Sequence, residues 1–221
     1  MSCILCNTRK SRRPCPAAQG DICPQCCAEQ REEKLDCPLT CEFLRESRKH
    51  EKYVPVPKSA TPHPEVKLTE DFLGRNDLLM QFLSVAVRDA ALLTPGATDA
   101  DLREAVDAVV QTLKTADSGL IYETRPANPF AASIQEKINA QIAELKRLID
   151  ERSAGKTVRD KDTLGILVFI ARVSLSLNNG KRKGRSFMAM LLERFPVPES
   201  QVGLAEAPRT AASPSGLIVS S

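Results

Sequence analysis

The chain has 221 residues, which is enough for one medium domain with additions but not for two large domains. Hydrophobic residues make up 42% of the chain, whereas aromatic residues make up only 4% and tryptophan is absent. A core built mostly of Leu, Ile, Val and Ala favours packed helices over a β-sandwich. The formal net charge of +3 is too small to indicate nucleic-acid binding by itself.

Neither a membrane span nor a signal peptide is evident. No stretch reaches the roughly 18 consecutive apolar residues that a span needs, and the N-terminus has no apolar run after a basic region. We therefore expect a cytoplasmic protein. In that reducing compartment, clustered cysteines are more often metal ligands than disulfides.

All the cysteines lie near the N-terminus, where their spacing predicts metal binding. They are Cys3, Cys6, Cys15, Cys23, Cys26, Cys27, Cys37 and Cys41. Two Cys-x2-Cys pairs and one Cys-x3-Cys pair have the short loops that let two thiolates reach one ion about 2.3 Å away. Eight thiolates match two tetrahedral zinc sites. The segment has few apolar residues, and each structural zinc can supply on the order of 10 kcal/mol of folding free energy.

The neighbouring Cys26 and Cys27 project differently, so we assign them to different ions. The predicted arrangement is interleaved: Cys3, Cys6, Cys23 and Cys26 at one ion, and Cys15, Cys27, Cys37 and Cys41 at the other. Cys41 is expected in the first turn of a helix, whose amide dipoles stabilise a thiolate. A disulfide framework is one alternative. An iron–sulfur cluster is another, although the closely spaced ferredoxin run is missing.

Three cysteine motifs carry a resemblance to a known group of proteins. Cys-Ile-Leu-Cys, Ile-Cys-Pro-Gln-Cys-Cys and Asp-Cys-Pro-Leu-Thr-Cys-Glu-Phe-Leu resemble the N-terminus of an uncharacterised bacterial family, and the stretch from Tyr122 to Pro129 is also similar to it. The resemblance covers most of the chain and implies a cysteine cluster joined to a helical domain, with no known activity. The interleaved cysteines also resemble cross-braced treble-clef fingers of the MYND or HIT type, which are mainly protein-interaction modules. This chain departs from those fingers because it has no histidine at the final ligand positions.

Composition divides the chain into four parts and indicates a mainly α fold. A cysteine-rich zinc-binding module over 1–52 is followed by a proline-rich, semi-rigid linker over 53–67. A bundle of about five helices is predicted over 68–196. The remainder, 197–221, is rich in Ala, Ser and Pro and is predicted to be disordered.

Apolar periodicity and capping residues place the helices of the bundle. They are expected at 70–93, at 98–117, from Asn128 onward, at about 160–177 and at 186–195. Thr98 followed by Asp101 resembles a capping box, and Asn128 before Pro129 is a suitable helix start. The fourth helix is apolar on most sides, which predicts a place in the centre of the bundle. Alternating, strand-like patterning is not evident.

Two basic runs are candidate nucleic-acid contacts. They comprise Arg9, Lys10, Arg12 and Arg13, and Lys181, Arg182, Lys183 and Arg185. Lysines and arginines of this kind contact phosphates, but acidic residues lie near the first run and no aromatic residues interleave it. Solvated loops are therefore the favoured interpretation. If both loops lie on the same face of the protein, the hypothesis of nucleic-acid binding becomes stronger.

The link between the second and third helices offers a candidate partner groove at Tyr122, Arg125 and Asn128. The alternative is that Tyr122 packs on the bundle and Asn128 caps the next helix. His50 and His63, the only histidines, are expected at the surface, and neither completes a catalytic triad.

The leading prediction is therefore a non-catalytic adaptor or regulatory protein with structural zinc. It would bind a macromolecular partner, in the first place a protein, and the helical domain would supply a second contact surface or a dimer interface. A nucleic-acid-binding regulator is the second hypothesis. The third is a thiol redox switch, in which oxidation releases zinc and unfolds the module.

Overall fold

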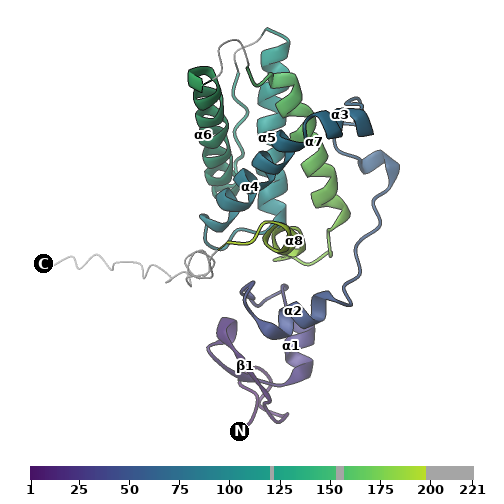
Figure 1. The fold of residues 1–221 in the computed structure, drawn as a ribbon. Helices are drawn as coiled ribbons and strands as arrows, with labels where there is room; N and C mark the ends of the chain where they lie inside the picture. The colour runs from purple at the N-terminus through teal and green to yellow at the C-terminus, as the bar shows by residue number, and fades with distance from the viewer. Residues whose placement is uncertain (120–121, 153–156, 198–221) are drawn as a thin grey trace, which may run out of the picture.

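The chain folds as a small cysteine module joined to a larger helical body (Figure 1). The computed structural model describes residues 1–119, 122–152 and 157–197. Helices predominate in these residues, as the composition predicts. The segment predicted to be disordered lies outside the described residues except for Val197.

A short hairpin and two short helices make up the module. They are β1 (Arg13–Cys15), the 3-10 turn η1 (Pro16–Ala18), β2 (Gly20–Ile22), α1 (Pro24–Gln30) and α2 (Glu42–Arg48). The strands are antiparallel, with Cys15 opposite Gly20. Gln19, at φ 53°, adopts the left-handed conformation that reverses the chain between them. Strands of three residues are too short for an alternating pattern to show, which is why the sequence does not reveal them.

In the described residues, six helices form the body: α3 (Glu70–Arg75), α4 (Asp77–Leu92), α5 (Asp99–Asp117), α6 (Pro129–Arg152), α7 (Asp160–Ser176) and α8 (Ser186–Arg194). The sequence predicts one helix over 70–93, and the structure divides it at Asn76. The Asn76 side chain donates a hydrogen bond to the carbonyl of Phe72. A side chain that bonds to the backbone in this way offers an alternative to continued helix.

The core of the body lies where α5, α6 and α7 meet α4 and α8. α5 packs against both α6 and α7, and α4 packs against α6, α7 and α8. α7 is buried along most of its length, as its apolar sequence predicts. The capping box at Thr98 and Asp101 is also confirmed, since each side chain bonds the other residue's backbone amide.

Both halves of the predicted linker are held on the body. In the first half the Val54 amide donates to the Asn178 carbonyl at 2.7 Å. In the second half the Arg172 guanidinium of α7 donates to the carbonyls of Pro62, His63 and Val66. His63, expected at the surface, is instead 8% exposed, and its Nε2 lies 2.8 Å from the Asp107 carboxylate. Of the helices in the described residues, none has the length and apolar character to cross a membrane.

Candidate metal centre

The first knuckle of the module is formed by the chain's N-terminus. The Cys3 amide donates to the carbonyl of Arg9, and the Cys3 carbonyl accepts from the Asn7 amide. Asn7 has a φ of 54°, the left-handed conformation that closes the turn after Cys6. The Ile4 amide bonds to the carbonyl of Asp21 in β2, so the knuckle is fixed against the hairpin.

The second knuckle is the first turn of α1. Cys23 is the N-cap of this helix, and its Sγ accepts a hydrogen bond from the Cys26 amide at 3.4 Å. Amide donation to sulfur is the contact that a metal knuckle uses to stabilise its thiolates. Cys27 follows Cys26 directly, and one helical step turns its side chain to another direction.

These two knuckles bring together four sulfur atoms. The Sγ atoms of Cys3, Cys6, Cys23 and Cys26, the first quartet, all lie within 4.8 Å of one another. Tetrahedral zinc with Zn–S bonds of 2.3 Å requires sulfur separations of about 3.8 Å. The first quartet could therefore hold a metal ion, and the four cysteines of this half of the interleaved prediction do lie together.

Electrostatics within the first quartet favour a bound cation. Hydrogen bonds from Thr8, followed by the Arg9 amide, lower the pKa of Cys6 to about 5. Burial, followed by the neighbouring cysteines, raises the pKa of Cys26 to about 12. The hydrogen bond from the Cys26 amide also lowers the pKa of Cys23. The site thus favours the thiolate at Cys6 and Cys23 and disfavours it at Cys26. A divalent cation removes that conflict, because it compensates several thiolates at once.

Arg9 adds a second positive group to the first quartet. Its guanidinium donates to Cys23 Sγ at 3.5 Å and approaches Cys26 Sγ at 3.9 Å. A divalent ion held by four thiolates keeps a net charge of −2, which a neighbouring arginine partly offsets. Sequence reasoning named Arg9 only as a nucleic-acid candidate. The signal that could have indicated this role is a basic residue in the segment between the two Cys-x2-Cys pairs.

The remaining cysteines, Cys15, Cys27, Cys37 and Cys41, form the second quartet and line one narrow enclosed cavity. Their sulfurs are gathered less tightly than those of the first quartet, which alone within the described residues meets the 4.8 Å condition. Cys27 and Cys37 are buried, and the Arg31 guanidinium donates to Cys27 Sγ at 3.4 Å. Burial raises the pKa of Cys37 to about 11. Cys41 is the N-cap of α2, close to its expected place at a helix start.

The cysteines are all free thiols, with no disulfide between any two of them. The two quartets share structural elements: β1 and β2 join them, and Cys26 and Cys27 are consecutive residues of α1. A single small core contains residues of both quartets together with Ile22, Leu35 and Leu44. The two quartets are therefore parts of one folded module.

The first basic run lies around the first quartet and the hairpin. Lys10 and Arg12 are exposed, whereas the Arg13 guanidinium lies 4.7 Å from the centre of the Phe43 ring. Two of the four candidate contacts in this run, Arg9 and Arg13, thus also have partners inside the module. The exposed pair remains accessible to a ligand.

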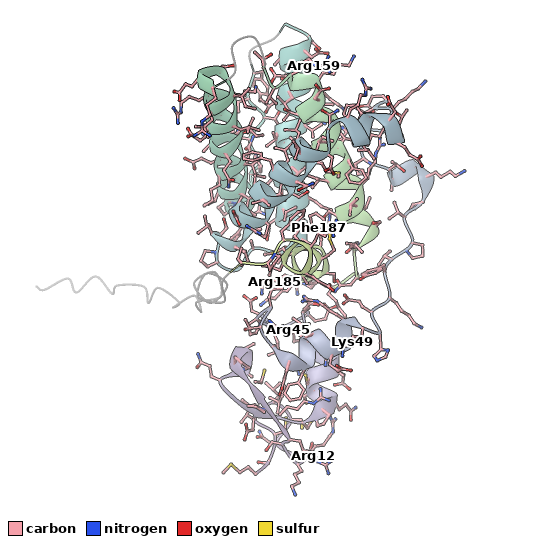
Figure 2. The ribbon with its side chains drawn as sticks, viewed as in Figure 1. Arg12, Arg45, Lys49, Arg159, Arg185 and Phe187 are labelled. Carbon is pink, nitrogen blue, oxygen red and sulfur yellow. The ribbon has the colours of Figure 1, made fainter. Side chains whose placement is uncertain are left out.

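The second basic run lies between the module and the body. Arg185 is 6% exposed, Lys183 Nζ donates to the carbonyl of Lys34, and Lys181 Nζ lies 3.6 Å from the Glu33 carboxylate. Arg182 is exposed. Figure 2 shows Arg185 at the junction and Arg12 at the opposite end of the module, so the structure does not bring these two together.

The residues of the predicted partner groove are spread along α5 and are not gathered at one place, because the Tyr122 carbonyl accepts from Thr115 near the end of this helix whereas Asn128 bonds Asp101 at its start. Tyr122 is 66% exposed, so it does not pack on the bundle. Arg125 pairs with Glu123 at 3.0 Å. Asn128 starts α6: its Oδ1 accepts from the Phe130 amide, and its Nδ2 donates to Asp101.

No protein-family model, curated protein or solved structure matches this chain. The resemblance to a bacterial family consequently remains an expectation from the sequence motifs.

Proposed function

We propose that this is a zinc-binding, non-catalytic adaptor or regulatory protein of the cytoplasm. Two zinc ions, one in each cysteine quartet, would fold the module, and the folded protein would bind another protein. The observation that carries the proposal is the first quartet, where two knuckles gather four sulfurs within 4.8 Å. A closed set of four thiolates is typical of structural zinc, whereas catalytic zinc keeps an open position.

Both histidines follow the last cysteine of the module, Cys41, in the chain, which supports a non-catalytic role. His50 is exposed just after α2, and His63 contacts Asp107 and Lys114 on α5. Neither ring is therefore offered to a cysteine as the base of a nucleophilic pair.

Metal analysis tests the zinc proposal directly. The protein, purified without added metal, is subjected to elemental analysis and absorption spectroscopy. We expect about two zinc ions per chain and no visible colour, because zinc has a filled d shell. Iron with visible absorption bands would replace zinc with an iron–sulfur cluster, and one zinc per chain would restrict the metal to the first quartet.

An open cleft on the module supports a protein partner. It has a volume of about 550 Å³, and it is lined by Pro14, Pro16 and Phe43 together with the acidic Asp21 and Glu42. A concave surface with apolar walls and a few polar groups is the usual form of a recognition site. The cleft lies beside Cys15 and Cys41, so metal binding at the second quartet would shape it.

Two charge-reversing variants test the partner proposal. Proteins that bind the zinc-loaded chain are captured from a cytoplasmic extract, and the dissociation constant of each is then measured with Asp21→Arg and Glu29→Arg. Both residues are exposed and acidic, but only Asp21 lines the cleft. We expect Asp21→Arg to weaken binding by about 10-fold or more and Glu29→Arg to leave it unchanged.

Three outcomes would contradict a protein adaptor. They are equal effects of the two substitutions, the absence of any captured protein, and capture of nucleic acid with affinity that falls steeply with salt. The last outcome would favour the exposed Lys10, Arg12 and Arg182 as contacts with phosphates.

A further inference from the structure

The module and the body meet through a buried carboxylate. Glu32, in the loop after α1, is 2% exposed. Its Oε1 accepts from the Arg185 amide and the Arg48 guanidinium, each at 3.0 Å, and its Oε2 accepts from Asn179 at 3.0 Å. The Glu32 carbonyl accepts from the Lys183 amide at 2.7 Å. A buried carboxylate without these donors would be costly, so Glu32 is stable here only while the module is docked.

The body contributes a buried arginine, Arg185, to the same contact. The Arg185 guanidinium donates to the carbonyl of Ala97 at 2.7 Å and to the carbonyl of Cys37 at 3.1 Å, and it pairs with Asp36 at 2.6 Å. Two of these three contacts belong to the module. Arg185 therefore contacts both the backbone of Cys37 and the side chain of Asp36, at the start of the segment that carries the second quartet's last two ligands.

An apolar side chain completes the contact. Leu39 lies between Cys37 and Cys41 in sequence, yet it belongs to the hydrophobic core of the body. It shares a small cavity with Ala91, Leu92, Ala97 and Met188. We call residues 36–41 the docking loop, because Asp36, the Cys37 carbonyl and Leu39 all contact the body.

The docking loop is bounded by two ligands of the second quartet, Cys37 and Cys41. Within the module, the Arg45 side chain donates to the Leu39 carbonyl, and the Cys41 amide donates to the Pro38 carbonyl. The contacts of the first quartet with Arg9 and the hairpin lie within the module. The second quartet thus spans the docking loop, whereas the first quartet does not. Further contacts come from beyond Cys41, where Arg48 donates to the Arg185 carbonyl and Glu51 accepts from Asn179 and Ser186.

We propose that metal binding at the second quartet controls whether the module docks on the helical body. The inference rests on the proposed function, since it requires metal in the module. Metal at Cys15, Cys27, Cys37 and Cys41 fixes the docking loop and places Leu39 and Glu32 against the body. Loss of that metal frees the loop and uncovers the end of the body beside α8.

Amide hydrogen exchange can report docking at single residues. The Lys183 and Arg185 amides donate to Glu32 of the module. The Phe187 and Met188 amides donate to Asp99 of the body, at 2.7 and 3.0 Å. Loss of docking should therefore accelerate exchange at the first pair and leave the second pair protected.

The test compares Cys41→Ser with Cys6→Ser in the full chain, with metal content measured on each protein. Each variant removes one ligand, from the second and the first quartet respectively, and we expect each to lose about one zinc. Cys41→Ser should accelerate exchange at Lys183 and Arg185 by about 100-fold, whereas Cys6→Ser should leave it near the original rate. Cys41→His, which restores a zinc ligand, should restore protection at both amides.

Several results would overturn the inference. Protection at Lys183 and Arg185 that survives Cys41→Ser with its metal lost would do so, as would equal acceleration in Cys6→Ser. If Cys41→Ser proves too unstable, a chelator titration of the unaltered protein follows the same four amides as zinc leaves. Zinc content decides the proposed function and amide protection decides the docking mechanism, so the two can fail separately.

Discussion

Arg9 and Arg31 each donate to a cysteine sulfur, one in each quartet. At the scale of single residues, this is how the module offsets the charge of closely spaced thiolates. The groups that surround metal ligands often affect metal affinity nearly as much as the ligands themselves. The two arginines are thus expected to slow metal release without binding the metal.

Arg9→Gln tests this role. Removing the guanidinium should raise the rate of zinc release from the first quartet by about 10-fold, because the thiolates lose a hydrogen-bond donor with positive charge. The measurement is zinc transfer to a coloured chelator under stopped-flow mixing. Lys10→Gln, next in the chain and also exposed, removes the same charge and should release zinc at the original rate. Equal release from both variants would assign the effect to net charge alone.

Asp99 is a second residue whose surroundings make a measurable prediction. It lies at the start of α5, is 4% exposed, and caps α8 by accepting from the Phe187 and Met188 amides. Burial raises the pKa of Asp99 from its ordinary 3.8 to about 6. Between these values the folded state binds more protons than the unfolded state, so the stability that Asp99 contributes falls as pH rises through about 6.

Comparison with Asp99→Asn isolates that effect, because acid release of metal is common to both proteins. From pH 5 to pH 7, the free energy of unfolding of the original protein should fall by about 1 kcal/mol relative to the variant. Urea denaturation at the two pH values measures the difference. A constant difference would mean that the amide donors fully offset the burial of this carboxylate.

At the scale of elements, α3 and α7 meet where a glycine removes a side chain. A Cβ added to Gly165 of α7 would lie 2.5 Å from the Phe72 ring of α3. Gly74, the penultimate residue of α3, has no atom within 4 Å of such a Cβ. The first glycine therefore permits close packing of two helices, whereas the second only weakens its own helix.

Two alanine substitutions should consequently have opposite signs. Gly165→Ala should lower the free energy of unfolding by about 1–3 kcal/mol, because the Phe72 ring must move in a packed region. Gly74→Ala should raise it by about 0.5–1 kcal/mol through helix propensity. Urea denaturation measures both. A stabilising Gly165→Ala would show that the Phe72 ring moves away at no cost.

Sequence reasoning performs well where the signal is local. The knuckles at Cys3 and Cys23 depend on residues a few positions apart, so spacing alone predicts each knuckle. Their pairing at one ion is a long-range contact, for which the adjacency of Cys26 and Cys27 is the only sequence signal. The capping box at Thr98 and the buried α7 are likewise encoded within one helix. The break at Asn76 is missed, because apolar residues continue on both sides of it and only a side-chain bond to the backbone divides the helix.

Long-range contacts are beyond such reasoning. The second basic run looks like a solvated or phosphate-binding loop because its partners, Glu32 and Asp36, lie about 150 residues earlier in the chain. Burial of His63 has the same cause, since Asp107 and Arg172 come from distant helices. Charge runs and single histidines carry no information about which distant element they will meet.

At the scale of the whole molecule, the module and the body depend on different forces. The module's core is small and built around cysteines, whereas the body has an extensive apolar core of its own. Small domains seldom bury enough apolar surface to fold unaided, and a metal can supply the difference. The two parts should therefore respond differently to metal removal.

A strong chelator should unfold the module and leave the body folded. We expect amide protection to be lost over α1 and α2 and to persist over α5 and α7, because the body's buried core does not involve the cysteines. Hydrogen exchange followed by mass spectrometry, with and without chelator, measures this. Loss of protection over α7 as well would mean that the whole chain folds as one cooperative unit. Return of zinc should restore protection over α1 and α2.

The anchoring of residues 62–66 by Arg172 has a kinetic consequence. If undocking also breaks the hydrogen bond from the Val54 amide to the Asn178 carbonyl, the module remains tied to the body by the short stretch 52–60, which spans about 30 Å at most when fully extended. Its local concentration near the docking surface is then in the millimolar range. Rebinding of the module should follow first-order kinetics that do not depend on protein dilution. Any other molecule that binds the uncovered surface must compete with the tethered module at this local concentration.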